Sequence, residues 1–237
     1  LFAVQIYCDF SGYTDIAIGC ARVMGIKLMK NFDRPYTAKT IKEFWARWHI
    51  SLSTWFRDYL YFPLGGSRCS KSRHMFNLFV VFLASGLWHG ANWTFVLWGI
   101  IHAIYRIVGE LTYKSREKLW ARVGVNTSSV PFSILRRVLT FILVCFSWIF
   151  FRANSLSDLG ILLTKLFTDF GSIGGTLNMM GIGLTAALVA VFSVFVMTEF
   201  DILTGREETE ALVGASRKTG IMWCVWAVAV AWIMLYS

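Results

Sequence analysis

The most constraining feature of the sequence is a long apolar run with a histidine at its centre. No Asp, Glu, Lys or Arg lies between Arg73 and Arg106, and the segment Ser85-Gly-Leu-Trp-His-Gly-Ala-Asn-Trp93 places His89 in the middle of this run. An ionisable side chain at membrane depth is costly unless it lines a cavity or has a partner. His89 is therefore a candidate functional residue, and the alternative is a histidine that hydrogen-bonds between packed helices.

The composition indicates a membrane protein. Hydrophobic residues make up 56% of the 237 positions and charged residues 16%, whereas soluble domains carry about 25% charged residues. The net charge is +9, and the basic residues cluster in the connections between apolar runs. This distribution is typical of topology signals and of contacts with anionic membrane lipids, so we expect a lipid partner and no nucleic acid.

The start of the chain and its cysteines add two expectations. The chain opens with Leu1 inside an apolar stretch, so we expect further sequence, including any signal segment, to precede it. The five cysteines contain no Cys-x-x-Cys pair. We therefore predict neither a metal site nor a disulfide framework.

Apolar segments alternate with basic connections along the whole chain. We predict an all-α fold, a polytopic integral membrane bundle with an amphipathic or re-entrant helical region. The expected elements are a span at 1–26, a basic connection at 27–74, a double crossing or re-entrant hairpin at 75–105, and spans at 131–151, 177–198 and 220–236. The 75–105 segment exceeds the roughly 20 residues that one crossing needs, and the region from Gly86 to Gly90 is a natural break.

Charge bias orients these segments. The connection at 27–74 holds ten Lys and Arg residues against three acids, and the stretch from Arg106 to Arg137 holds seven against two. Under the positive-inside rule both connections face the cytoplasm, so the run between them crosses twice or dips in and returns. His89 then lies at or near the turn of a hairpin, and the charge-balanced loop after Arg152 lies outside.

The basic connection is predicted to contain one amphipathic helix from Thr40 to Tyr61. Thr40-Ile-Lys-Glu43 is a capping-box pattern, and Glu43 and Arg47 form an i,i+4 pair. Apolar positions at helical spacing form one stripe, which consists of Trp45, Trp48, Leu52, Trp55, Phe56 and Tyr59. Such a helix lies at the membrane interface or packs against the bundle. His49 falls on the aromatic side of this helix. Two interpretations of His49 stay open there, a packed core residue and a functional residue.

The first span carries polar side chains at i,i+4 spacing. Gln5, Asp9 and Tyr13 share one helix face, and Ser11 and Asp15 form a second pair. Carboxylates inside a span are expensive, so we expect both to face the bundle interior and to have partners. They serve either as contacts between helices or as a wall of a polar tunnel.

Four ordered motifs carry a family resemblance. They run from Gln5 to Gly19, from Asn31 to Tyr36, from Phe44 to Gly66 and from Ser85 to Gly90. This series resembles the membrane-bound O-acyltransferase family, in the branch of alginate O-acetyltransferases and relatives that acetylate secreted polysaccharides. The resemblance covers about the first 105 residues, and Phe146-Ser-Trp-Ile-Phe-Phe-Arg152 extends it. It implies that roughly the N-terminal half of the family fold lies outside this chain.

The resemblance also implies two catalytic residues. The family's invariant histidine, in an apolar run before a glycine, corresponds to His89, and a second motif histidine corresponds to His49. Histidine titrates near neutrality and can take the proton of a hydroxyl that attacks an acyl thioester. An apolar tunnel around the site would suppress hydrolysis of the donor.

Supporting roles follow for neighbouring residues. Trp88, Asn92 or backbone N–H groups could hold the oxyanion or orient the imidazole. Arg47, Arg57 and Arg68 lie in the basic region and would attract the phosphates of a donor such as acetyl-CoA.

The resulting hypothesis is a multi-pass acyltransferase of the bacterial cytoplasmic (inner) membrane that uses a cytoplasmic thioester, without a bound cofactor, to O-acetylate an exopolysaccharide. The family implies a partner in the periplasm or cell wall that completes transfer to the sugar. One alternative is transfer of D-alanine from a carrier protein to teichoic acid. Another is a non-enzymatic transporter in which His89, Asp9 and Asp15 form a proton relay. His89-dependent consumption of an acyl thioester distinguishes an enzyme from a transporter.

Overall fold

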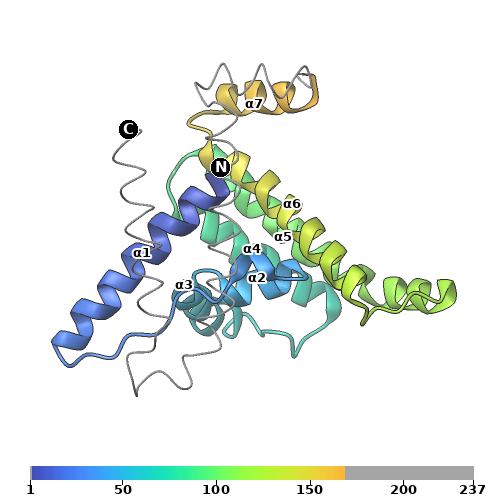
Figure 1. The fold of residues 1–237 in the computed structure, drawn as a ribbon, viewed down its shortest axis with the longest axis horizontal. Coiled ribbons are helices and arrows are strands. Elements are labelled where there is room, and N and C mark those ends of the chain that lie inside the picture. Colours follow the sequence, from blue (N-terminus) through green and yellow to red (C-terminus); the bar gives the residue numbers. More distant parts are fainter. Residues whose placement is uncertain (1, 169–237) are drawn as a thin grey trace, which may run out of the picture. The chain divides into compact units, whose positions relative to one another are not determined.

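The described part of the chain, residues 2–168 of this computed structural model, is helical and contains no strand (Figure 1). The elements are α1 (Phe2–Val23), the 3-10 turn η1 (Pro35–Thr37), α2 (Ile41–Arg47), α3 (Ile50–Phe56), the π-helical turn η2 (Arg57–Tyr61), α4 (Lys71–Trp88), α5 (Trp93–Val123), α6 (Val130–Arg152) and α7 (Leu156–Thr168). This agrees with the all-α prediction. The predicted spans at 177–198 and 220–236 lie outside the described residues.

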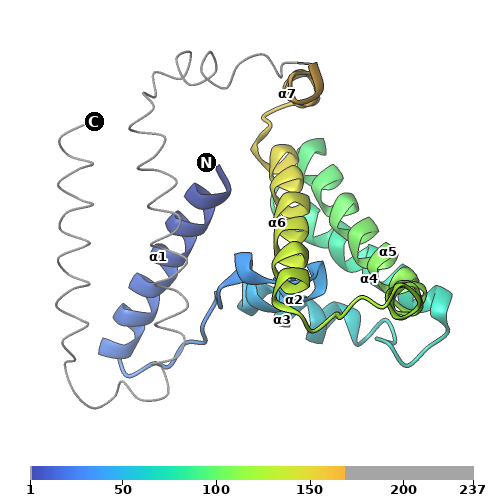
Figure 2. The same ribbon diagram turned by 45° about the vertical axis from the view of Figure 1, so that its right-hand side comes forward.

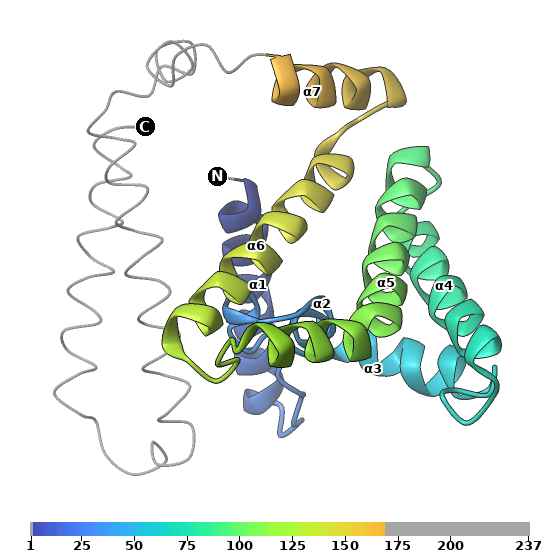
Figure 3. The ribbon, with the colours of Figure 1, turned by 90° about the vertical axis from the view of Figure 1, so that its right-hand side faces the viewer.

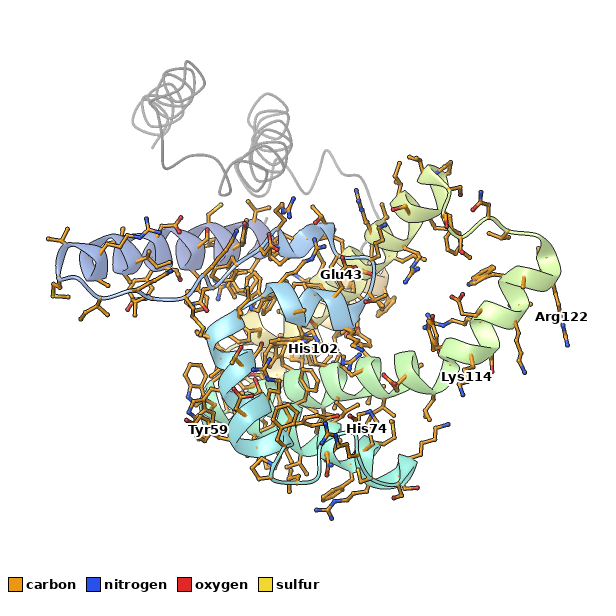
Figure 4. The ribbon with its side chains drawn as sticks, turned by 90° about the horizontal axis from the view of Figure 1, so that it is seen from below. Glu43, Tyr59, His74, His102, Lys114 and Arg122 are labelled. Atoms are coloured by element: carbon orange, nitrogen blue, oxygen red, sulfur yellow. The ribbon has the colours of Figure 1, made fainter. Side chains whose placement is uncertain are left out.

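Two of the described helices, α5 and α6, are long and apolar enough to cross a membrane. α6 coincides with the span predicted at 131–151. Pro131 lies in its first turn, where a backbone N–H has no helical partner in any case, so the N–H that proline lacks costs no hydrogen bond. α5 differs from the prediction, because it continues through Arg106 instead of ending in a loop. It stops only at Gly124, which adopts the left-handed conformation with φ +69°. The basic side chains of this extension, such as Lys114 and Arg122, therefore project from a helix (Figure 4).

α4 and α5 pack side by side as a helical hairpin (Figure 3). The cause is a pair of facing glycines. A Cβ atom added to Gly86 would lie 2.5 Å from the carbonyl oxygen of Phe95, and one added to Gly99 would lie 2.4 Å from that of Phe82. Only glycine allows the two backbones to approach this closely. The turn of the hairpin falls in the stretch that the sequence marks as a break.

The predicted single helix from Thr40 to Tyr61 is wrong. The structure divides it at Trp48 and His49 into the short helices α2 and α3, and the π-helical turn η2 completes the segment. Figures 2 and 3 show both short helices between α1 and the α4–α5 hairpin. The expectation that this segment packs against the bundle is correct for α2, which contacts α5.

Backbone hydrogen bonds from a distant segment explain the break. The N–H of Asp33 donates to the carbonyl oxygen of Arg47 at 2.9 Å, and the N–H of Ile50 donates to that of Asn31 at 3.0 Å. These bonds replace helical ones, and His49 between them takes the left-handed conformation with φ +47°. Apolar spacing carries no information about such long-range bonds, so the sequence pattern does not reveal the break.

The start of α2 follows its predicted chemistry. The Thr40 hydroxyl accepts a hydrogen bond from the N–H of Glu43 at 3.0 Å, and the Glu43 carboxylate accepts one from the N–H of Lys39 at 2.7 Å. Glu43 and Arg47 form the expected ion pair, with 2.6 Å between nitrogen and oxygen. A helix of seven residues is marginal alone, so these caps and its buried face hold it in place.

An aromatic core joins the elements that are far apart in sequence. Trp48 is only 4% exposed, and its ring centroid lies 5.0 Å from Phe32 and 5.2 Å from Trp148. The core consists of Tyr7, Phe32, Tyr36, Phe44, Trp48, Trp98 and Trp148. Aromatic pairs contribute about 0.5–1.5 kcal/mol each beyond the area they bury. α1, α2, α5 and α6 are thereby tied to one another.

α7 is a helix that the sequence pattern does not predict. The Ser155 hydroxyl accepts a hydrogen bond from the N–H of Asp158 at 3.1 Å and so caps it. Leu159 is buried, whereas large apolar side chains such as Ile161 and Phe167 are exposed. The loop predicted after Arg152 is therefore only a few residues long.

We expect Gly99→Ala to destabilise the full-length protein by about 1–3 kcal/mol, the usual cost of overpacking a tight contact. Gly109→Ala on the same helix is the matched control. A Cβ at Gly109 meets nothing within 4 Å, so this change should be neutral or stabilise by up to about 1 kcal/mol through helix propensity. Thermal unfolding in detergent measures both, and equal midpoint shifts for the two variants would contradict the close α4–α5 contact.

Candidate active site

His89 lies at the C-terminus of α4, at the turn into α5. Its half-buried ring is surrounded by aromatic rings, with centroid distances of 4.9 Å to Trp88, 5.0 Å to Phe151 and 5.2 Å to Trp98. Gly90 follows with φ +145°, and a Cβ there would lie 3.2 Å from the Phe95 ring. Glycine is therefore needed to turn the chain directly after the histidine.

The alternative of a histidine hydrogen-bonded between helices finds no support within the described chain. No hydrogen bond joins the His89 side chain to another residue in 2–168, and its contacts there are with aromatic rings. An imidazole held by apolar walls keeps its nitrogen atoms available for a ligand. Both the functional role and the packing role of His89 therefore stay predictions.

His49 lies at the break between α2 and α3, on the other side of Trp88. The His49 ring centroid is 4.7 Å from Phe10 of α1, at an interplanar angle of 86°, and 6.0 Å from Trp88. Trp88 thus contacts both imidazoles, and its own side chain is 58% exposed. The structure therefore brings together His49, Trp88 and His89, three of the residues that the sequence singles out.

The electrostatics of this pair favour neutral imidazole at His49. Burial, and to a smaller extent a positive charge on His89, lower the pKa of His49 from 6.5 to about 4. Since two imidazolium ions so close together repel, protonation of one opposes protonation of the other. The imidazole of His49 is thus neutral at physiological pH.

The polar residues of α1 lie elsewhere. Asp9 and Asp15 are exposed, and Tyr13 is 68% exposed. The expected interior position of the two carboxylates is therefore wrong for the described chain, since the buried face of α1 is made by residues such as Tyr7 and Thr14. The i,i+4 spacing correctly groups the polar residues on one face but cannot show which face packs.

A shallow cleft of about 210 Å³ opens between α1 and the segment that follows it. Tyr13, Thr14, Ile18, Met29, Asn31 and Ser51 line it. Tyr13 is the one predicted tunnel residue among them. Asn31 and Ser51 adjoin His49 in the structure, so the cleft reaches the neighbourhood of the candidate base.

Both polar atoms of the Asn92 side chain are hydrogen-bonded within the protein. Its side-chain oxygen accepts a hydrogen bond from the N–H of Thr94 at 3.1 Å, which caps α5. Its side-chain nitrogen donates to the carbonyl oxygen of Asn154 at 2.8 Å, which ties the turn to the loop before α7. These two bonds fix the turn that carries His89. They favour a positioning role for Asn92 over the binding of an oxyanion.

Two of the three predicted phosphate-attracting arginines, Arg47 and Arg57, are each paired with an acid. Arg47 contacts Glu43 and donates to the hydroxyl of Thr37 at 2.8 Å. Arg57 is exposed and pairs with its neighbour Asp58 at 2.7 Å. An acid beside each guanidinium offsets its positive field, so these residues contribute less to anion attraction than the sequence suggests.

His102 and Trp45 form a contact that the sequence does not predict. His102 is fully buried, and the indole N–H of Trp45 donates to its Nδ1 at 3.1 Å. Figure 4 shows His102 deep among the side chains of the interior. Its complete burial makes His102 a packing residue of the core. No group of three or more metal-ligating side chains occurs in the part of the chain that the structure describes.

Comparison with known proteins gives a consistent result. The sequence model of the family described as MBOAT, membrane-bound O-acyltransferase family, matches residues 1–151. A probable alginate O-acetylase of Pseudomonas syringae is 45% identical over 70% of this chain, and a peptidoglycan O-acetyltransferase of Helicobacter pylori is 43% identical over 66%. A teichoic acid D-alanyltransferase of Bacillus subtilis is 35% identical over 65%. The matched part covers 30%, 28% and 40% of the length of these relatives.

We expect acidification from pH 7 to pH 5 to destabilise the full-length protein partly through His49. In this range the unfolded chain protonates His49, whose pKa is then near 6.5, whereas the folded chain, with a pKa of about 4, does not. The unfolded state binds more protons, so stability falls as the pH falls. His49→Asn, which tolerates the left-handed backbone, should show a smaller loss of thermal stability over the same range. An identical pH dependence in both proteins would contradict the burial of His49.

Proposed function

The chain belongs to the membrane-bound O-acyltransferase family, and on this premise we propose that the full-length protein O-acetylates a polysaccharide. The acetyl group comes from a cytoplasmic thioester such as acetyl-CoA and reaches sugar hydroxyls on the outer side of the membrane. The similarity to proteins named alginate O-acetylase and peptidoglycan O-acetyltransferase supports acetyl transfer. The lower identity to a D-alanyltransferase makes D-alanyl transfer the weaker candidate.

One observation carries this proposal: two histidines that share contacts with Trp88 at the turn of a helical hairpin. His89 belongs to the Ser85–Gly90 motif and His49 to the Phe44–Gly66 motif. These motifs are separated in sequence, yet their histidines lie close enough for their charges to interact. A pair of neutral imidazoles beside aromatic walls is suited to proton transfer in a site with little water.

The chemistry assigned to His89 is general base catalysis. It accepts the proton of the acceptor hydroxyl as that oxygen attacks the thioester carbonyl carbon. A carbon–oxygen bond forms, the carbon–sulfur bond breaks, and the proton passes to the leaving thiolate. His49 shares this proton transfer. Their mutual repulsion keeps one imidazole neutral while the other carries the proton.

The proposed location is the bacterial cytoplasmic membrane, with several crossings. α5 and α6 supply two apolar helices of sufficient length, and the basic residues of the 27–74 connection and of the α5 extension favour the cytoplasmic side for both. We further propose that an extracytoplasmic protein completes delivery to the polysaccharide, because the acceptor is a polymer outside the cell.

We expect His89→Ala to lower consumption of radiolabelled acetyl-CoA by membranes containing the full-length protein by about 10²–10⁴-fold, the usual contribution of a general base. His74→Ala is the control, because His74 lies outside the proposed site. His74 belongs to α4, and its Nδ1 atom is hydrogen-bonded to the hydroxyl of Tyr61 at 2.9 Å. Both variants should accumulate in the membrane. Near-normal acetylation of extracellular polysaccharide by the His89 variant would remove this residue from the mechanism, and proton transport without acetyl consumption would favour a transporter.

Topology gives an independent test. We expect single cysteines introduced at Lys39 and Lys118, with the native cysteines replaced, to react with a membrane-impermeant reagent from the cytoplasmic side only. A cysteine at Ser157 should react from the outer side, because α6 lies between Lys118 and Ser157. If positions 39 and 118 label from opposite faces, the α4–α5 hairpin does not return to the side from which it enters.

A further inference from the structure

Asn31 contacts the candidate base His49 through its side chain. Its Oδ1 atom lies 3.4 Å from Nδ1 of His49, 3.0 Å from the backbone nitrogen of Ser51 and 2.7 Å from the Ser51 hydroxyl. Its backbone oxygen also accepts the N–H of Ile50. Asn31 therefore binds three consecutive residues at the start of α3, and it does so from a segment eighteen positions earlier.

The hydrogen-bond network determines the orientation of the Asn31 amide. The backbone nitrogen of Ser51 can only donate, so the side-chain atom that it contacts must be the oxygen. An amide oxygen is only an acceptor. The nitrogen of His49 that faces this oxygen lies 3.4 Å away, and an acceptor at this position favours a hydrogen on Nδ1, which leaves Nε2 with its lone pair.

We propose that Asn31 is a positioning residue that fixes His49 in the Nδ1–H tautomer and so presents Nε2 as the proton acceptor. The inference rests on the proposed acyl transfer, in which His49 shares the proton with His89. Asn31 touches neither substrate nor reacting atoms in this scheme. It acts through the ring of His49, as an orienting group acts on a catalytic imidazole.

The surroundings of His49 support a single ring orientation. Phe10 of α1 packs perpendicular to the ring at 4.7 Å, and Trp88 of α4 lies at 6.0 Å. A ring flip would exchange Nδ1 for a carbon and would place no N–H opposite Asn31. Among the described residues packed against His49, the titratable group whose charge acts on it is His89, and the Asn31 and Ser51 side chains are uncharged.

The decisive substitution is Asn31→Asp. A carboxylate has the same shape and still accepts both bonds from Ser51, so this change keeps the contact with α3 and alters the charge opposite His49. A carboxylate opposite the Nδ1–H also favours the imidazolium form of His49, and an opposite charge at this range shifts a histidine by about 1–3 pH units. We expect the acid limb of the pH–kcat profile to move upward by about one unit or more, with little change in the KM for acetyl-CoA.

Asn126→Asp is the matched control. The Asn126 side-chain oxygen accepts a hydrogen bond from the backbone N–H of Ser128 at 3.0 Å, in an exposed turn between α5 and α6. The same exchange of amide for carboxylate there should leave the acid limb in place. A second variant, Asn31→Ala, removes the acceptor and should lower kcat per folded enzyme while the KM for acetyl-CoA stays the same.

Two results would overturn the proposal. One is an acid limb that stays in place in purified, folded Asn31→Asp enzyme. The other, should that variant not fold, is an Asn31→Ala enzyme with wild-type kcat. Either result leaves the acyltransferase function intact if His89→Ala still abolishes acetyl transfer. Activity that survives in both His89→Ala and His49→Asn would instead overturn the proposed function itself.

Discussion

The direct backbone contact between α4 and α5 determines where the candidate catalytic groups lie. Gly86 and Gly99 each place a Cα where any side chain would strike a carbonyl oxygen of the other helix. Because the contact occurs close to the helix ends, the chain must reverse within a few residues, and His89 falls in that reversal. The Asn92 bonds to Thr94 and Asn154 then keep the turn in one conformation. The position of His89 thus follows from helix packing.

The aromatic core connects this hairpin to the second histidine. Trp48 immediately precedes His49 and packs against Trp148 of α6, while Trp98 of α5 contacts both Trp148 and His89. A change in the packing of α2 would therefore reach both imidazoles through large, rigid rings. This coupling gives a physical reason why motifs separated by tens of residues would serve one site in the proposed enzyme. It also explains why so many tryptophans lie near two histidines.

The sequence predicts the helical class and the α6 helix, and it singles out His89 and His49, which the structure brings to opposite contacts of one indole, because apolar runs, caps and isolated ionisable groups are local signals. It does not predict the break at His49, because Asn31 and Asp33 supply the replacement hydrogen bonds from a distant segment. It misplaces Asp9 for a related reason, since spacing identifies a polar face without identifying its neighbours. The sequence pattern does not predict α7, because the stretch after Arg152 is charge-balanced and is typical of a loop. In the structure the Ser155 hydroxyl caps a helix there.

The length of the hairpin sets a depth for the reaction. In the proposed topology Arg73 and Arg106 lie at the same membrane face. The apolar part of α4, from His74 to Trp88, is about 22 Å long at a rise of 1.5 Å per residue, whereas the hydrocarbon layer is about 30 Å thick. His89 would then lie roughly three quarters of the way across. In the proposed reaction an acceptor hydroxyl arriving from the far side would have to enter by only about 8 Å, whereas a cytoplasmic thioester would have to extend a slender arm of nearly three times that length. This asymmetry would let a bulky polymer and a bulky nucleotide both remain in water while their reacting atoms meet.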